Sequence, residues 1–121
     1  MFVLLLMLAL LADSPASSTP VIDGVPRLLA HPSAQDMVDA YPSRALRDGV
    51  RGRVVIACRL TADGRLAACT VAEETPPGLG FGAAALKMAP HFRWAPTYGS
   101  GKSVEGNVRV PLIWNPPPSR D

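Results

Sequence analysis

The chain has 121 residues, with 12 Lys and Arg against 10 Asp and Glu, and a formal net charge of +2 at pH 7. This length suits one small domain. The basic residues are scattered and form no block of like charge, so the composition predicts no nucleic-acid partner.

The chain opens with an unbroken apolar run from Phe2 to Ala12. As a helix this run would span ~16 Å, which is too short to cross ~30 Å of bilayer hydrocarbon. A run of this length before small residues is typical of a secretory signal peptide, which we assign to residues 1–16 and which predicts a periplasmic protein. The alternatives are a buried N-terminal segment or, if the true start lies upstream, an inner-membrane anchor. Residues 17–32 are polar, contain proline and are interpreted as a linker.

Two short helices are expected after the linker. Ser33 is a candidate N-cap, with Asp36 three residues later, and the first helix ends near Ala40 because a proline follows. Pro42 is then expected as the first residue of a second helix, which Gly49 ends.

The spacing of apolar residues next changes to a period of two, which predicts a β-hairpin. One strand covers residues 53–61, the other covers residues 65–73, and Asp63-Gly64 is a strong turn signal between them. Centring the hairpin on this turn pairs Cys58 with Cys69, Ile56 with Val71 and Leu60 with Ala67. A one-residue slip would place Ile56 and Val71 on opposite faces, so the apolar pattern supports this register.

Cys58 and Cys69 are the two cysteines of the chain. An even number in an exported protein favours a disulfide, and directly opposed strand residues lie within disulfide range. Two reduced core thiols are one alternative. A metal or redox site with His91 is another, but zinc needs about four ligands and the pair is not a C-x-x-C motif. We therefore predict no metal and no cofactor.

The last two elements are a helix and a strand. Residues 81–89 carry apolar side chains at helical spacing, and Pro90 breaks or kinks this helix. Residues 104–114 alternate strictly, which indicates a strand buried on one side, and Pro111 favours an edge position because it cannot donate to a ladder. The element order α-α-β-β-α-β predicts an α+β fold, a small three-stranded antiparallel sheet with helices packed on one face.

Several of these segments together resemble the TonB C-terminal domain family. The stretch "YPSRALRDGVRGRVVIACRLTADGRLAACTV" is similar to the opening of that domain, "AALKMAPHFRWAP" to its helix, and "GKSVEGNVRVPLIW" to its closing strand. The resemblance covers residues 33–115, which leaves residues 116–121 as a tail. The two cysteines depart from the family pattern, since they stand at strand positions usually filled by plain hydrophobes. The stretch from Ala12 to Tyr41 is also short, at most ~100 Å when fully extended.

The resemblance implies a non-enzymatic docking domain for energy-coupled transport. Its partner would be the box peptide of a TonB-dependent outer-membrane receptor, added as a strand to the sheet edge. An ExbB-ExbD-type complex would be a further partner only if the chain has an N-terminal anchor. Arg44 matches the receptor-facing arginine of the family motif "YPxRA". The strand residues expected to bind the partner are Val104, Glu105, Gly106, Asn107, Val108, Arg109, Val110, Leu112 and Ile113.

Other interpretations remain open at this point. The chain could be an orphan periplasmic adaptor, a structural domain without energy transduction, or a Cys/His metal-binding protein. The edge strand could be blunted by Arg109 and Pro111 against aggregation, or could pair two copies as a homodimer. Arg44 could be a solvated helix charge. Phe92, Trp94 and Trp114 lie on apolar periods and are interpreted as packing residues rather than a ligand cage. Neither histidine has a neighbouring pattern that suggests a catalytic triad.

Overall fold

The computed structural model describes residues 26–118, so the signal peptide predicted for residues 1–16 lies outside the described residues. The described elements follow in the order β1 (Leu28–Ala30), α2 (Ala34–Ala40), α3 (Ser43–Arg47), β2 (Gly52–Leu60), β3 (Leu66–Thr75), α4 (Phe81–Met88), the 3₁₀ turn η1 (Ala89–His91), β4 (Arg93–Trp94) and β5 (Gly106–Trp114).

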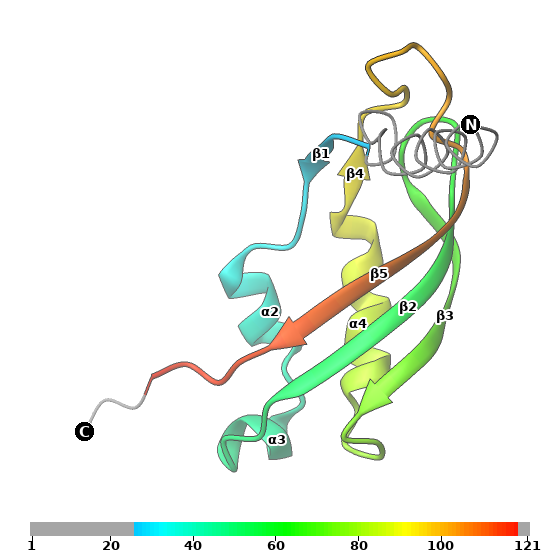
Figure 1. The fold of residues 1–121 in the computed structure, drawn as a ribbon. Helices are drawn as coiled ribbons and strands as arrows, with labels where there is room; N and C mark the ends of the chain where they lie inside the picture. The colour runs from blue at the N-terminus through cyan, green and yellow to red at the C-terminus, as the bar shows by residue number, and fades with distance from the viewer. Residues whose placement is uncertain (1–25, 119–121) are drawn as a thin grey trace, which may run out of the picture.

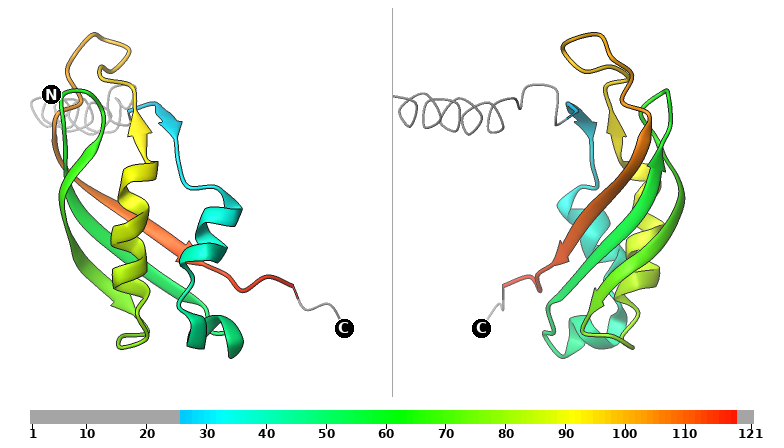
Figure 2. Two further views of the ribbon diagram at one scale, coloured as in Figure 1. Left: turned by 180° about the vertical axis from the view of Figure 1, so that it is seen from behind. Right: turned by 45° about the vertical axis from the view of Figure 1, so that its right-hand side comes forward.

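The main sheet has three antiparallel strands in the order β3-β2-β5, so that β2 is central and β3 and β5 form the two edges. Helices α2 and α4 lie on one face of this sheet, and Figure 1 shows the other face turned toward the viewer. Seen from behind in Figure 2, the helices stand in front of the strands. The predicted α+β fold with helices on one face is confirmed, and so is the edge position of the last strand.

Helix α2 begins with the predicted capping box. The Ser33 hydroxyl accepts a hydrogen bond from the Asp36 N–H at 3.0 Å, and the Asp36 carboxylate accepts one from the Ser33 N–H at 2.8 Å. The hydrogen bond from the Ser33 N–H is the main cause that holds the pKa of the Asp36 carboxyl below its ordinary value of 3.8, and the Ser33 side chain adds to this effect. The helix ends at Ala40, as predicted.

Helix α3 begins one residue later than expected. Pro42 is its N-cap rather than its first residue, because its ψ of 128° is extended while its carbonyl already accepts a hydrogen bond from the Leu46 N–H at 2.9 Å. The extended residue turns the chain between two helices that have different directions. Gly49 has a φ of 68° and follows the end of the helix, in agreement with the predicted stop.

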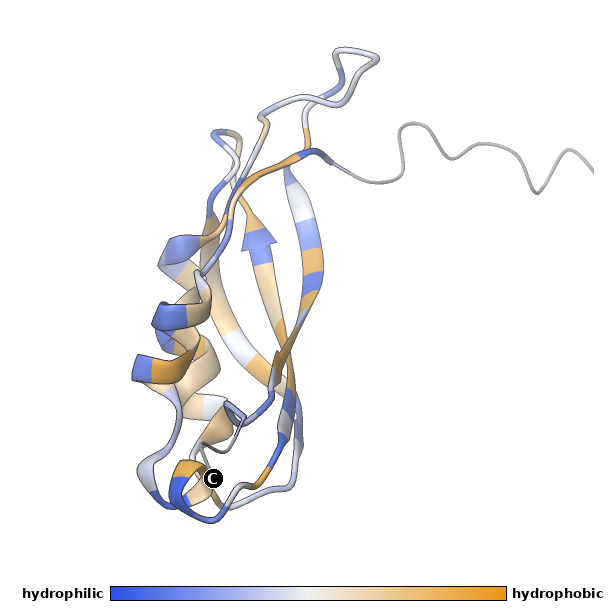
Figure 3. Cartoon of the chain, turned by 90° about the vertical axis from the view of Figure 1, so that its left-hand side faces the viewer, coloured by the Kyte–Doolittle hydropathy of each residue, from blue (hydrophilic) through white to orange (hydrophobic). Residues whose placement is uncertain are grey.

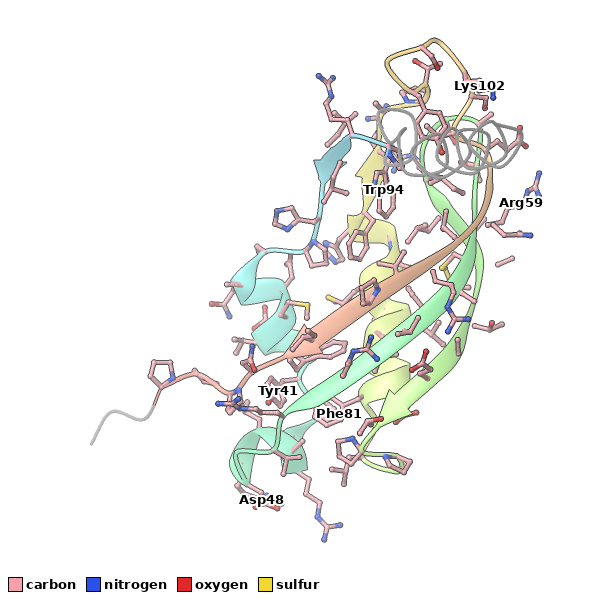
Figure 4. The ribbon with its side chains drawn as sticks, in the orientation of Figure 1. Tyr41, Asp48, Arg59, Phe81, Trp94 and Lys102 are labelled. Carbon is pink, nitrogen blue, oxygen red and sulfur yellow. A yellow bond between two sulfur atoms is a disulfide. The ribbon has the colours of Figure 1, made fainter. Side chains whose placement is uncertain are left out.

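The core lies between the sheet and the helices and is centred on aromatic rings. The Phe81 ring packs edge-on against Tyr41 at 5.7 Å between centroids and lies 5.8 Å from the Trp114 ring. Figure 4 shows Tyr41 and Phe81 together behind the sheet. Gly52 permits this packing, because a Cβ atom there would lie 2.4 Å from the Phe81 ring. Burial raises the pKa of the Tyr41 phenol, which donates to the Val50 carbonyl.

The middle of the β2–β3 hairpin has the predicted register. Ile56 pairs with Val71, and Cys58 is joined to Cys69 by a disulfide with the Cα atoms 4.1 Å apart. The predicted disulfide is therefore present. Both cysteines take part in the packing on the helix side of the sheet.

The register changes toward the turn, and here one predicted pair is wrong. Leu60 pairs with Leu66 rather than with Ala67. The cause is a β-bulge in which Ala68 is an extra residue on β3, with a left-handed φ of 51°. A second register shift occurs between Val55 and Ile56, so β3 is an irregular strand.

Residues that were interpreted as part of the linker form a small second sheet. β1 pairs with β4 through Leu28 and Trp94, and the Ala95 N–H donates to the Arg27 carbonyl at 2.8 Å. On its other side β4 meets the tip of the hairpin, where the Trp94 N–H donates to the Gly64 carbonyl at 2.8 Å. Strands of two or three residues have no detectable period, which is why the sequence did not indicate them.

Helix α4 ends at Met88, close to the predicted end. The chain continues through the 3₁₀ turn η1, which contains Pro90. A proline in this place removes a helical hydrogen bond, and the tighter turn redirects the chain into β4.

Candidate partner-binding edge

Strand β5 pairs with β2 along its whole length without a register shift. The ladder runs from Gly52 opposite Trp114 to Leu60 opposite Gly106. The other side of β5 pairs with no strand among residues 26–118. A regular strand with one unpaired side presents backbone groups to which another strand can bind.

Pro111 fixes which backbone groups point outward. In an antiparallel ladder, alternate residues bond to the neighbouring strand. Pro111 has no N–H, yet the ladder continues through its pair with Val55, so its nitrogen must face away from β2. The N–H groups of Asn107, Arg109 and Ile113 therefore share the outward direction, and Pro111 contributes only a carbonyl to this edge.

The side chains of β5 alternate between the core and the open face, as predicted. Val110 and Leu112 are buried, whereas Asn107, Arg109 and Ile113 are exposed. Figure 3 shows this alternation as changing colours along β5. Val110 and Leu112 were expected to bind a partner, but their side chains are buried and, by the same alternation, their backbone groups bond to β2.

Two predicted binding residues lie before the strand rather than in it. β5 begins at Gly106, so the expected strand start at Val104 is wrong. Val104 is buried and its N–H donates to the Pro96 carbonyl at 3.1 Å, which removes this group from the free edge. Glu105 also precedes β5, and its carboxylate accepts a hydrogen bond from the Arg59 guanidinium of β2 at 2.9 Å.

Arg44 lies apart from the centre of this edge. It belongs to α3, which lies near the bottom of Figure 1, below the C-terminal end of β5. Its side chain is exposed and forms no ion pair with the other residues of the described range. The guanidinium is thus available to solvent or to a partner.

The open face of the sheet carries a short row of charges beside β5. The Glu73 carboxylate pairs with Arg109 at 2.8 Å and with Arg53 at 3.4 Å. All three side chains are about half exposed, so each pair contributes little to stability. Between them Val55 is only 5% exposed, although it belongs to this face and not to the main core. The charged side chains therefore cover an apolar centre.

A small pocket lies along the C-terminal part of β5. Its lining comes from residues 111–113 of β5, from Met37 of α2, from Phe92, and from His31 and Pro32, which connect β1 to α2. His31 and Pro32 fall within residues 17–32, which the sequence indicated as a linker, so their position in this pocket was not predicted. No local signal indicates it, because the contact depends on how β1 packs against β4.

A metal or redox site at Cys58, Cys69 and His91, which the sequence left open, is not supported by the arrangement of these three residues. The disulfide leaves neither cysteine sulfur as a thiolate, which is the form that binds metals. His91 lies 3.4 Å from the Asp36 carboxylate, and His31 Nδ1 lies 2.8 Å from the Pro32 carbonyl oxygen. Among residues 26–118 there is no group of three side chains that could hold a metal ion.

The aromatic residues act in packing, as interpreted from their spacing. Trp114 is 1% exposed and Phe92 is 8% exposed. Trp94 stacks on Phe92 with the ring centroids 5.5 Å apart and the planes within 8°. Trp94 therefore covers the end of the core near the hairpin tip.

Comparison with known proteins identifies the family. Residues 38–116 match the family model described as the Gram-negative bacterial TonB protein C-terminal domain, whereas a comparison with curated proteins gives no match. The match covers more than half of the chain and includes the main sheet but not β1. Domains of this family are periplasmic, non-enzymatic interaction modules in energy-coupled transport. No helix within the described part of this chain is long and apolar enough to cross a membrane. The chain belongs to the family of the TonB C-terminal domain.

Proposed function

We propose that this domain binds the box peptide of a TonB-dependent outer-membrane receptor as an added strand along β5. The observation that carries the proposal is the regular ladder between β5 and β2, which leaves one complete, unbulged side of β5 unpaired among the described residues. Family membership supplies the class of partner.

The opposite edge of the sheet is less suited to this task. β3 contains two register shifts, and Ala68 adopts a left-handed conformation in one of them. Bulges interrupt the regular spacing of backbone donors and acceptors and so protect an edge from pairing. We therefore assign strand addition to β5 and not to β3.

The added strand would form its hydrogen bonds with the outward groups of β5. Asn107, Arg109 and Ile113 each offer a donor and an acceptor, and Pro111 offers an acceptor alone. The edge thus binds with one hydrogen bond fewer than an unbroken strand, which limits affinity and also limits unwanted self-association. In this arrangement Arg44, beyond the end of β5, would make a charge contact with the receptor.

The test is an NMR titration of the ¹⁵N-labelled chain, recovered from the periplasm, with short synthetic peptides from the N-terminal segments of TonB-dependent receptors. We expect amide shifts along residues 106–114 and slower hydrogen exchange at Asn107, Arg109 and Ile113 once the peptide is bound. Shifts confined to β3, or no shift with any receptor peptide, would contradict the proposal.

Export by residues 1–16 belongs to the same proposal. It is supported by the apolar run from Phe2 to Ala12, which is too short to span a bilayer. N-terminal sequencing of protein from fractionated cells tests it. Recovery of intact Met1 in the membrane fraction would show an anchor instead.

A further inference from the structure

We propose that the pocket beside β5 receives one apolar side chain of the added strand, and that His31 and Pro32 determine which side chain it accepts. We call it the His31 pocket; it is lined by His31, Pro32, Met37, Phe92 and residues 111–113. The inference rests on the proposed function. It adds a specificity element that lies outside the segment matching the family model, which begins at residue 38.

The alternation of side chains in a sheet directs one peptide residue to this pocket. Leu112 is 4% exposed and points to the helix side, whereas Ile113 is 56% exposed and points to the open face. Residues opposite each other in paired strands project from the same face. The peptide residue opposite Leu112 would therefore point toward α2 and into the His31 pocket. Its two neighbours in the peptide would lie on the open face.

The size of the pocket fits a side chain better than a free ligand. Its volume is about 200 Å³, compared with ~300–1,000 Å³ for typical small-molecule sites. Such a space holds one side chain of moderate size. The continuity of the pocket with the free edge of β5 indicates that this side chain comes from a strand on β5.

The chemistry of the lining favours an apolar side chain. Met37, Phe92, Pro32 and residues 111–113 present mainly carbon atoms, and no carboxylate lines the pocket. A charged side chain would lose its hydration there without gaining a partner of opposite charge. His31 is the one polar side chain in the lining, and it is exposed to solvent.

The wall is held in place by contacts on both sides. The Ala95 N–H donates to the Arg27 carbonyl at 2.8 Å, which anchors β1 and the chain that leads to His31. On α2, the Met37 carbonyl accepts a hydrogen bond from the Trp114 indole at 3.0 Å. The pocket is therefore formed before a strand arrives, which lowers the cost of ordering it on binding.

The test compares His31→Asp with Thr70→Asp, using the receptor peptide that gives the largest shifts at β5. His31→Asp introduces a carboxylate at the wall of the pocket, whereas Thr70→Asp introduces one at an exposed position on β3, the opposite edge. We expect His31→Asp to raise the Kd about tenfold, and Thr70→Asp to change it less than about twofold.

A series of peptides with single alanine substitutions then locates the coupled position. Alanine at the residue opposite Leu112 should abolish the difference between His31→Asp and the wild-type chain, and alanine at either neighbour should not. His31→Phe, which narrows the pocket without adding charge, should favour the peptide with alanine at that one position. It also provides a second test if His31→Asp disturbs folding.

The outcomes separate the two proposals. If no receptor peptide binds the wild-type chain, the proposed function fails and this inference fails with it. If peptides shift β5 but His31→Asp and His31→Phe bind every peptide as the wild type does, strand addition stands and the His31 pocket is not a specificity element. Equal weakening by His31→Asp and Thr70→Asp would show a general charge effect and would also overturn the inference.

Discussion

The indole Nε1 of Trp114 donates a hydrogen bond to the carbonyl oxygen of Met37 at 3.0 Å, which ties the last residue of β5 to α2. Carbonyl groups in the last turn of a helix lack helical partners. The Tyr41 N–H, which would be the usual donor for Met37, donates to the Val38 carbonyl at 3.1 Å instead. One side chain of the candidate edge strand therefore completes the hydrogen bonding of the helix beside it.

Replacing Trp114 with Phe should remove this donor while keeping an aromatic ring in the core. We expect the free energy of unfolding to fall by about 1–3 kcal/mol, because a carbonyl near the core loses its partner. Urea unfolding measures the change. Trp94→Phe is the matched control, since Trp94 is only half-buried and its ring stacks rather than fills the core. Equal losses for both variants would show that ring volume alone explains the effect.

Gly64 is expected to tolerate no side chain. Its φ is 84°, and a Cβ atom there would lie 1.9 Å from the Trp94 carbonyl oxygen. Gly78 has a similar φ of 80° but open space around it. Gly78→Ala should therefore lower the free energy of unfolding only through the strain of a left-handed backbone, by about 1–2 kcal/mol. Thermal unfolding should place Gly64→Ala well below Gly78→Ala. Similar melting temperatures would mean that the hairpin tip does not pack on β4.

Replacing both Cys58 and Cys69 with Ala should lower stability and leave peptide binding intact. The bond closes a loop with a sequence separation of 11, and chain entropy for such a loop gives about 3 kcal/mol. Peptide binding should persist because the cysteines lie in the β2–β3 hairpin and not on β5. Intact mass without reductant checks the bond, and the peptide titration checks binding. Two titratable thiols in protein from the periplasm would refute the disulfide.

The free energy of unfolding is expected to fall in acid, partly because the Asp36 carboxylate becomes protonated. The backbone hydrogen bond from Ser33 is the main cause that lowers the pKa of this carboxylate, and His91 adds a smaller attraction. A lowered pKa in the folded state stabilises the protein above the ordinary value of 3.8, and this contribution is lost as the pH falls through the folded value. Asp36→Asn should therefore be less stable than the wild type at neutral pH, and the difference should shrink as the pH falls below the ordinary value of 3.8. Urea unfolding of both proteins from neutral pH into acid measures this difference in stability. A difference that does not change with pH would show that the charge of Asp36 is not its cause.

A pair of proline substitutions in β5 distinguishes its free side from its paired side. Asn107→Pro removes an outward N–H and should leave the ladder to β2 intact, as Pro111 does. We expect it to weaken peptide binding by about 0.5–1.5 kcal/mol with little loss of stability. Val108→Pro removes an N–H that faces β2 opposite Cys58, and should destabilise the fold itself. If Asn107→Pro unfolds the protein and Val108→Pro does not, the assigned direction of the backbone groups is reversed.

The sequence by itself determined the features that depend on local pattern. The period of two in residues 104–114 predicted which side chains of β5 are buried, because successive residues of a strand point to opposite faces. Ser33 and Asp36 predicted the start of α2, since a capping box needs only two residues three positions apart. The symmetry of the two cysteines about Asp63-Gly64, together with the apolar face they share with Ile56 and Val71, predicted the disulfide. The bulge at Ala68 shifts the register only between the cysteines and the turn.

Tertiary structure alone decided the features that join distant segments. The bulge at Ala68, the pairing of β1 with β4 and the position of His31 in one pocket with the end of β5 leave no local pattern in the sequence. Each of them follows from how separate elements pack, and packing is set by the combined shape of the core rather than by neighbouring residues. For this reason the candidate edge could be placed from the sequence, whereas the pocket that borders it could not.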